Sequence, residues 1–457
     1  MKTAFVNGTI ITGDGKTVLK KSSVLVDGDK IKYVGDNPDR SYVQNSDKRV
    51  DLRGRMLLPG LINSHAHGFV IGPGHIVVSA ERDVIRNLNK HLLHGVTTIL
   101  SLEGTVTYEE FERSSRLHPI NVKTATRHTP ANMQAEKVLV GDEVTDVHMK
   151  TTLTEMIEKG AAAIGEIGGG TIMGGAVQDY LCIPEALKKR TKVYTDMPGK
   201  YCKLLRVGAL GHDMDPSRFN PKMVKDGLQK LDISHVLSVE DARKLVEDLL
   251  LPQYRLAIQG YKEGVQAAAD FNMPVLLHSG PSAWKVMLEL APLGRNRMIA
   301  LHAPSGSHLG PEYRKRCFDT MKKLREQGVV IEACTLDMIT THKTYGGPEP
   351  FLELFRRKLT DIVTTDWGGG HFDSQLSGLQ LAIDKKLVDL PSAVRMATSR
   401  VGEVVPKLAP NRGLIAEGKI ADLVVVGRKD ISDVQMVVIG GEAVVEEGKI
   451  TKKSIIV

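Results

Sequence analysis

Cysteine is scarce in this sequence of 457 residues, which contains only four. They lack the Cys-x-x-Cys spacing of a structural zinc site and the density of a small disulfide-bonded scaffold. Sparse cysteines without these patterns are typical of proteins whose thiols stay reduced, so we expect a cytoplasmic protein. The four are Cys182, Cys202, Cys317 and Cys334.

Long apolar runs are also missing from the chain. No stretch of about 18 uninterrupted apolar residues is present, so we expect no membrane-spanning segment. The first residues, MKTAFVNGTIITGDGK, reach Asn7 and Gly8 before any apolar run of secretory length. This pattern indicates a strand and a turn, and it argues against a signal peptide.

Aromatic residues make up only 5% of the chain, and its formal net charge is +7. Lysine and arginine alternate with acidic residues, as in EDARKLVEDLLL, and no basic stretch is interleaved with aromatics. This pattern indicates a solvated surface, so we expect no nucleic-acid partner. The content of 42% hydrophobic and 25% charged residues is ordinary for a globular protein with a sizeable core.

Short strand patterns separated by turns occupy both ends of the chain. Residues 1–56 carry hairpin signals at Asn7-Gly8 and Asp27-Gly28, and residues 406–457 carry strands on either side of Gly440-Gly441. Because both ends show the same pattern of short strands and turns, we predict that they form one small β-sandwich domain. The rest of the chain is then inserted between its two parts.

The middle of the chain, residues 57–405, alternates between short apolar segments and helical patterns such as ERDVIRNLNKHLL. Strands that alternate with helices form a parallel sheet, and eight strands close a barrel. We therefore predict an α/β fold with a (β/α)₈ TIM-like barrel. The eight segments are MLLPGLINSHAH, VTTILSLE, INVKTATRH, AAAIGEIGGG, MPVLLHSG, MIALHAPSG, VVIEACT and IVTTDWGGG.

An insertion interrupts the alternation at about residues 171–251. Far more chain separates the fourth and fifth apolar segments than one helix requires. The insertion contains an amphipathic helix that begins at Ser238, with Asp241 placed for a capping box, and a further helix is predicted over residues 254–271. We place the insertion at the barrel mouth, where it either covers the site or makes a subunit contact.

Ligand-type side chains recur at the ends of the predicted barrel strands. His65 and His67 stand two apart at the end of the first strand, so both imidazoles face the same side. The carboxyl ends of barrel strands meet at one face, where active sites of this architecture lie. The other four candidates each end a later strand, and they are Glu166, His278, His302 and Asp366.

Imidazoles combined with carboxylates suit a Zn²⁺, Fe²⁺ or Mn²⁺ ion. Cysteine is absent from the set, which argues against a purely structural metal site. The sequence therefore predicts a metal-dependent enzyme with its centre at the barrel mouth.

These motifs resemble those of the metal-dependent amidohydrolase superfamily, and the resemblance covers nearly the whole chain apart from the insertion. Within the superfamily, GAAAIGEIGGG, MPVLLHSGP and VVIEACTL look most like the enamidase group, which opens cyclic enamides. The motifs that carry the resemblance to the superfamily are PGLINSHAH, HGVTTI, TTD, RMATSRVGEVV and IAEGKIADLVVV.

The resemblance implies a role for each strand-end residue. His65 and His67, with Asp366, would hold the more buried of two metal ions. His278 and His302 would hold the more exposed ion. Glu166 stands where many members carry a bridging carboxylated lysine, so it resembles the subset with a glutamate bridge. A one-metal site without this bridge is the competing reading.

The activity implied by the resemblance is hydrolysis of a C–N bond in a cyclic amide or enamide. Asp366 would act as general base and acid, taking a proton from water and passing it to the leaving nitrogen. The alternatives are an isoaspartyl dipeptidase or an N-acyl amino acid deacylase. Ring deamination and a non-catalytic assembly protein are further readings.

Three more residues are candidates for contact with a small-molecule substrate. Arg127 and His128 end the third strand, where Arg127 is placed either to bind a substrate carboxylate or to anchor the loop. His371 follows the glycines after Asp366. We also expect a homo-oligomer, which is the common state of such enzymes.

Overall fold

The computed structural model describes residues 1–35, 45–74, 77–169 and 177–451. Eight parallel strands form one sheet, and an isolated parallel bridge between Ala66 and Trp367 joins its two edges into a barrel. The predicted barrel is therefore confirmed. In chain order its strands are β6 (Leu61–Ala66), β9 (Val96–Ser101), β10 (Asn121–Thr126), β11 (Ala163–Ile167), β12 (Val275–His278), β13 (Met298–Leu301), β14 (Val330–Cys334) and β15 (Ile362–Thr364).

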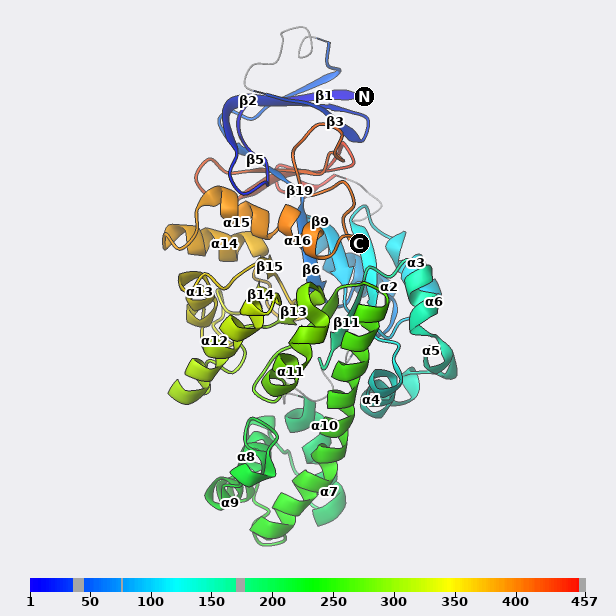
Figure 1. Cartoon of the computed structure of the whole chain (residues 1–457), viewed down its shortest axis with the longest axis vertical. Helices are drawn as coiled ribbons and strands as arrows, with labels where there is room; N and C mark the ends of the chain where they lie inside the picture. The colour runs from blue at the N-terminus through cyan, green and yellow to red at the C-terminus, as the bar shows by residue number, and fades with distance from the viewer. Residues whose placement is uncertain (36–44, 75–76, 170–176, 452–457) are drawn as a thin grey trace.

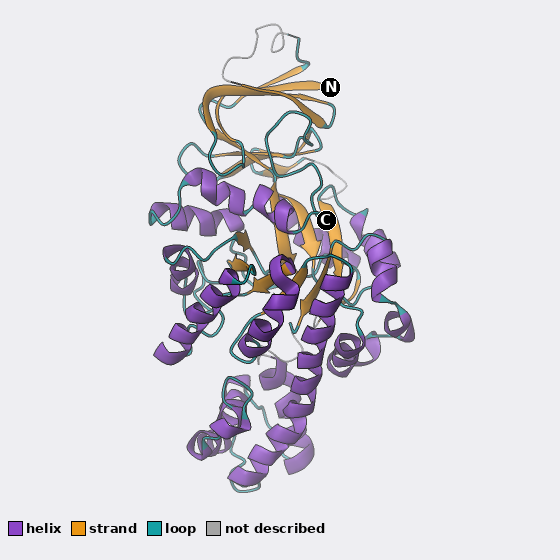
Figure 2. Ribbon diagram, in the orientation of Figure 1, coloured by secondary structure: helices purple, strands orange, loops and turns teal. Residues whose placement is uncertain are grey.

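Helices surround this sheet, as Figure 2 shows. They bury apolar side chains against the strands, and the largest core cluster includes Leu88, Val265, Phe318 and Phe351. Amphipathic helices of this kind need one apolar face, which the sequence supplies at helical spacing. The helices of the barrel are α2 (Glu81–Leu92), α3 (Tyr108–Ser115), α4 (Pro130–Val140), α5 (Asp146–Lys150), α6 (Leu153–Glu158), α11 (Trp284–Gly294), α12 (Pro311–Glu326), α13 (Glu349–Arg356), α14 (Gln375–Asp384), α15 (Leu390–Met396) and α16 (Ser399–Val404).

The two ends of the chain share a separate mixed sheet of nine strands, at the top of Figure 1. Its order is β19-β18-β17-β16-β5-β1-β2-β3, with β4 paired to β1, so the ends meet where β5 pairs with β16. The sheet continues through Pro59, just past the predicted limit at residue 56. Its strands are β1 (Lys2–Ile11), β2 (Val18–Asp27), β3 (Lys30–Gly35), β4 (Lys48–Asp51), β5 (Met56–Pro59), β16 (Leu423–Val426), β17 (Val434–Ile439), β18 (Glu442–Glu446) and β19 (Lys449–Ile450).

One predicted turn in this sheet is wrong. Asn7-Gly8 does not form a hairpin, because β1 continues through it with a bulge between Phe5 and Thr9. The hairpin after Asp27 is confirmed, with Asp27 paired to Lys30. The turn at Gly440-Gly441 is also confirmed, since Ile439 pairs with Glu442 across it.

The described part of the insertion forms a helical lobe at the bottom of Figure 1. It has its own hydrophobic cluster, which includes Leu187, Leu205 and Val246. Ser238 caps the last helix, and its hydroxyl accepts from the backbone of Asp241 at 3.0 Å. The helices are α7 (Ile183–Thr191), α8 (Gly199–Leu210), α9 (Pro221–Lys230) and α10 (Val239–Asp270).

The two helices predicted around residues 238–271 are a single helix, α10, with Pro252 inside it. It therefore runs unbroken from the lobe into the ring of barrel helices, through the predicted end of the insertion at residue 251. The domain limits themselves stay a prediction, and residues 170–176 at the start of the insertion lie outside the described residues. In the part of the chain that the structure describes, no helix is long and apolar enough to cross a membrane.

Candidate metal centre

Six predicted residues come together at the carboxyl ends of the barrel strands. His65 and Glu166 lie within β6 and β11, His67 directly follows β6, and His278 is the last residue of β12. His302 directly follows β13. Asp366 follows β15.

Hydrogen bonds between β6 and the chain after β15 fix this face of the barrel. The amide of Asn63 donates to the hydroxyl of Thr365 at 2.7 Å. The backbone N–H of Asp366 donates to the carbonyl of His65 at 2.9 Å, and the N–H of His67 donates to the carbonyl of Trp367 at 2.8 Å. The first and last strands are thereby joined at the residues that carry the site.

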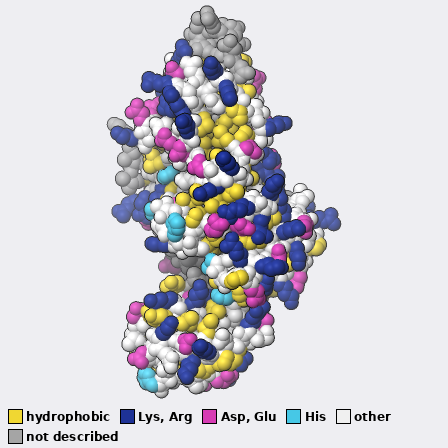
Figure 3. All heavy atoms as spheres, turned by 90° about the vertical axis from the view of Figure 1, so that its left-hand side faces the viewer, with side chains coloured by type: hydrophobic (Ala, Val, Ile, Leu, Met, Phe, Trp, Pro, Cys, Tyr) yellow, Lys and Arg dark blue, Asp and Glu magenta, His cyan; other side chains and the backbone are white. Residues whose placement is uncertain are grey.

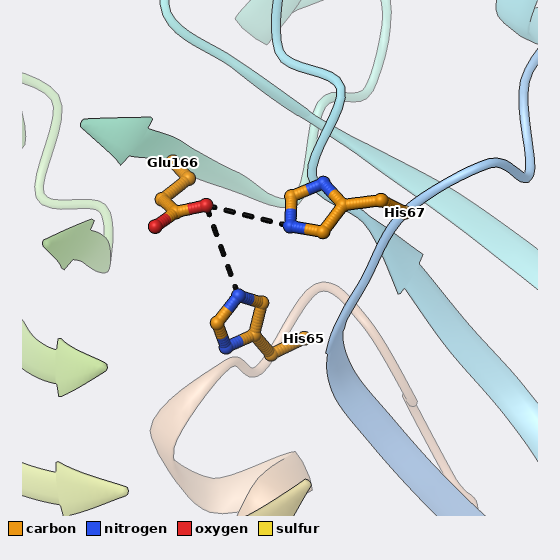
Figure 4. Close-up of side chains that lie close together, drawn as sticks. All are labelled: His65, His67 and Glu166. Carbon is orange, nitrogen blue, oxygen red and sulfur yellow. Dashed lines mark ion pairs between the residues drawn. The ribbon is translucent and has the colours of Figure 1, made fainter. Parts of the chain in front are cut away.

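Glu166 lies at the centre of the cluster, and its two carboxylate oxygens face different imidazoles. Oε1 lies 2.8 Å from His278 Nδ1 and 3.2 Å from His302 Nε2. Oε2 lies 3.4 Å from His67 Nε2 and 3.8 Å from His65 Nε2. Figure 4 shows the second of these groups, with both imidazoles directed at the carboxylate.

Asp366 contacts three imidazoles from two strand ends. Its Oδ1 lies 3.0 Å from His65 Nε2 and 3.7 Å from His67 Nε2. Its Oδ2 lies 2.9 Å from His302 Nδ1. The backbone at Asp366 and at His302 has a positive φ, 48° and 49°, a conformation that non-glycine residues rarely adopt and that is concentrated at functional sites.

Burial by itself raises the pKa of the Glu166 carboxyl, but hydrogen bonds from the surrounding imidazoles, led by His278, hold it well below the usual range. Burial likewise raises the pKa of Asp366, and the imidazoles of His302 and His65 outweigh it and lower that pKa. Both carboxylates are therefore ionised. Ionised carboxylates in a buried site require nearby positive charge.

The imidazoles respond in the opposite direction. Burial lowers the pKa of His65, but the charges of Glu332 and Asp366 outweigh burial and raise it above the usual range. His302 has a raised pKa for the same reason, with Asp366 as its main partner. A divalent cation would supply the positive charge that protons on these rings otherwise provide.

The donor set fits a pair of divalent metal ions. Three groups of ligand atoms each lie within 4.8 Å of one another, and Glu166 belongs to two of them. Neutral imidazoles and carboxylates are ligands that zinc, iron and manganese accept. The three groups are His65 with His67 and Glu166, His65 with His302 and Asp366, and Glu166 with His278 and His302.

Sequence reasoning missed Glu332 as a member of this site. It lies on β14, is fully buried, and its carboxylate contacts His65 Nδ1 at 2.9 Å. A carboxylate behind a ligand histidine sets the orientation and basicity of the ring. The signal in the sequence was a single acidic residue inside the apolar strand VVIEACT.

The predicted substrate contacts lie outside the cluster. Arg127 is 2% exposed and points its Nη2 at Glu136, 2.7 Å away. Its Nε donates to Thr105 at 2.9 Å. These contacts are those of a loop anchor, one of the two roles that the sequence left open for Arg127. The other role, binding a substrate carboxylate, stays a prediction.

His128 and His371 differ in their surroundings. His128 is buried, with Nδ1 2.9 Å from the hydroxyl of Thr126, and burial, reinforced by Arg127, lowers its pKa to about 4. His371 is exposed on the loop after β15. Their proposed contact with substrate stays a prediction.

Comparison with known sequences gives partial matches. No protein-family model matches the chain. A dihydroorotase of Lactobacillus gasseri is 24% identical over 255 residues, which cover 55% of this chain and 51% of the relative. A 5-methylthioadenosine/S-adenosylhomocysteine deaminase of Bacillus thuringiensis is 37% identical over 68 residues, 15% of each chain. The chain thus spans about half the length of the dihydroorotase that it matches.

Comparison with solved structures covers nearly the whole chain. A beta-aspartyl dipeptidase from Fervidobacterium islandicum AW-1 has a TM-score of 0.54 and 14% identity, over 99% of this chain and 98% of that one. Atrazine chlorohydrolase TrzN from Arthrobacter aurescens TC1, complexed with zinc, has a TM-score of 0.51 and 16% identity, over 98% and 96%. A. niger ochratoxinase has a TM-score of 0.52 and 14% identity, over 97% of this chain and 96% of that one. These likenesses concern the fold, which is the predicted barrel accompanied by a sheet from both ends of the chain.

Proposed function

We propose that this chain is a metal-dependent hydrolase of the amidohydrolase superfamily that cleaves a C–N bond in a cyclic amide or enamide. The observation that carries the proposal is the position of Glu166, whose two oxygens face two different sets of imidazoles. A carboxylate in that position can bridge two metal ions. The partial sequence matches to a dihydroorotase and a deaminase support the same superfamily.

Metal ions held in this cluster, zinc or iron with manganese as a further option, would supply a water of lowered pKa and a Lewis acid for the substrate carbonyl. His65 and His67 are placed to hold one ion together with Glu166. His278 and His302 are placed to hold a second on the other oxygen of Glu166. The rigid strand ends keep these side chains in fixed positions, which removes the reorganisation that a flexible site would require.

Asp366 is the residue that we assign to proton transfer. Its carboxylate is ionised because His302 and His65 keep its pKa low, so it can accept a proton from the attacking water. It would then deliver that proton to the departing nitrogen while the carbonyl carbon gains the hydroxyl. The products are a carboxylate and an amine, which stay in one molecule when the substrate is a ring.

The preference for a cyclic amide or enamide comes from the resemblance of strands β11, β12 and β14 to the enamidase group. An isoaspartyl dipeptide or an N-acyl amino acid is the alternative substrate class. The similarity to a beta-aspartyl dipeptidase is compatible with both, because it concerns the fold alone.

Turnover against a panel of lactams, cyclic enamides, cyclic imides, isoaspartyl dipeptides and N-acyl amino acids tests the proposal. We expect a single product heavier than a cyclic substrate by one water, with activity lost after chelation and restored by zinc or iron. Two fragments from an open amide would favour the alternative class. Release of ammonia from a ring, or no turnover by the metal-loaded protein on any of the panel, would contradict the proposal.

A further inference from the structure

A second group of polar side chains lines a small cavity between the insertion and the barrel. The cavity has a volume of about 60 Å³. One wall comes from α8 and the turn that follows it, and the other comes from the loops after β12 and β13. Its polar lining residues are Lys203, Arg206, His212, Ser282, Ser305 and His308.

This cavity lies next to the strand-end cluster. Ser305 follows His302 by three residues, and its backbone N–H donates to the carbonyl of His302 at 2.7 Å. Because three residues span at most about 10 Å, the Cα atoms of Ser305 and His302 lie within that distance of each other. One loop that lines the cavity therefore begins at a residue of the metal centre.

Basic side chains from α8 form one wall. The Arg206 side chain is 7% exposed, and its Nε and Nη2 donate to Asp179 at 2.7 and 3.0 Å. That pairing fixes the guanidinium and largely balances its charge. Lys203, one turn earlier on the same helix, is exposed and adds a positive charge beside the cavity.

The two histidines of the cavity are neutral donors. Burial, assisted by the charges of Arg206 and Lys203, lowers the pKa of His212 to about 4. Burial and Lys203 also lower the pKa of His308. A neutral imidazole donates one N–H, so both rings offer a hydrogen bond at neutral pH.

The size of the cavity limits what it can hold. One water needs about 10–15 Å³ of this kind of space, so the cavity has room for a small group of a few heavy atoms. The two oxygens of a carboxylate match this space, and the hydroxyls of Ser282 and Ser305 are donors of the kind that such oxygens accept from. In Figure 3 the lobe that carries α8 joins the barrel through a narrower section of the molecule.

We propose that this cavity binds a carboxylate of the substrate, with Lys203 as its main charged contact. The inference rests on the proposed function, and it narrows the substrates to amides that carry a carboxylate in addition to the bond that breaks. Lys203 is then a specificity-determining residue that takes no part in the chemical step.

Binding of glutarate to the metal-free protein tests the cavity without any need for turnover. We expect calorimetry to detect binding, and Lys203→Met to weaken it about tenfold or more because a charged hydrogen bond is lost. Lys200→Met is the matched control, since Lys200 lies on the same helix with its Nζ 4.8 Å from the ring centre of Tyr201, and we expect no change. Equal affinity in the wild type and Lys203→Met, no binding to the wild type, or tighter binding of inorganic phosphate than of glutarate would overturn the proposal.

Kinetics separate this inference from the proposed function. For a carboxylate-bearing amide that is turned over, Lys203→Met should raise KM about tenfold with kcat unchanged, and should leave KM for the matching carboxamide unaltered. If no amide is turned over but glutarate binding still depends on Lys203, carboxylate binding in the cavity is supported and the proposed hydrolase function is contradicted. If turnover occurs and Lys203→Met leaves KM unchanged, the hydrolase function is supported and the carboxylate site is contradicted.

Discussion

Two buried groups of charged side chains lie beside each other in the barrel, one between the loop after β10 and helix α4, the other at the strand ends. Beside β10, Arg127 faces Glu136 at 2.7 Å, one cation against one anion. At the mouth, two carboxylates face four imidazoles from three different strand ends. The two groups meet at Glu166, whose backbone carbonyl accepts from Arg127 Nη1 at 3.4 Å.

The difference between these groups separates a structural ion pair from a candidate metal centre. The Arg127–Glu136 pair balances its own charge and joins the loop after β10 to α4. The mouth cluster directs imidazole nitrogens and carboxylate oxygens at a common space, and protons on His65 and His302 balance the charge of its carboxylates. A divalent cation can replace the protons in such a cluster, whereas the ion pair is already balanced without a cation.

The largest effect is expected from Asp366→Asn, which removes the proton acceptor but keeps the size of the side chain. We expect kcat to fall about 10³-fold, within the range for general acid–base residues. The unfolding temperature should change little. Steady-state kinetics and thermal denaturation measure both quantities, and near-full turnover with metal bound would remove Asp366 from the proton-transfer role.

Glu136→Gln should show the opposite pattern. It leaves the buried Arg127 without a countercharge, and breaking a buried ion pair costs about 3–5 kcal/mol of unfolding free energy. We expect this loss in chemical denaturation, together with a metal content close to that of the wild type. A variant as stable as the wild type would show that the pair does not have the structural role assigned to it.

Glu332→Gln sharpens the comparison within the mouth itself. Its carboxylate orients the ring of His65, and loss of such a partner weakens metal affinity about 10–100-fold. Competition with a chelator of known affinity measures the change. Unaltered affinity would place Glu332 outside the metal centre.

The smallest effect concerns His118, a buried ring whose hydrogen-bond partners belong to neither group. Its Nε2 donates to Asn89 at 3.1 Å, its Nδ1 accepts from Ile120 at 3.2 Å, and burial lowers its pKa to about 3. Below pH 6.5 the unfolded chain binds a proton on His118 that the folded chain does not bind. The free energy of unfolding therefore decreases as the pH is lowered, by up to about 1.4 kcal/mol per pH unit. His118→Gln should reduce this slope between pH 6 and 4, and an unchanged slope would contradict the buried neutral ring.

The barrel and the strand-end residues could be predicted because both depend on local sequence. Apolar β-branched segments mark the strands, and the polar residue that ends each segment marks the mouth, as with His278 after VLL. These signals need no knowledge of long-range contacts.

Other features depended on contacts between distant residues and could not be predicted. Gly8 does not turn the chain, since the side chain of Leu52 packs where a Cβ would stand and β1 pairs with β4 and β5 from much later in the sequence. Pro252 lies inside one long helix because both halves of α10 are anchored, in the lobe and against the barrel. Glu332 joins the site only because β14 faces the ring of His65.

The metal content of the purified protein tests the central claim most directly, that Glu166 bridges two metal ions at the barrel mouth. Elemental mass spectrometry of the wild type and of Glu166→Gln, each after loading with zinc and removal of excess, gives the number of ions per chain. We predict about two for the wild type and about one or fewer for the variant. One ion or fewer per wild-type chain would contradict the bridge, and fewer than one ion with no activation on adding metal would also contradict the proposed metal-dependent hydrolase.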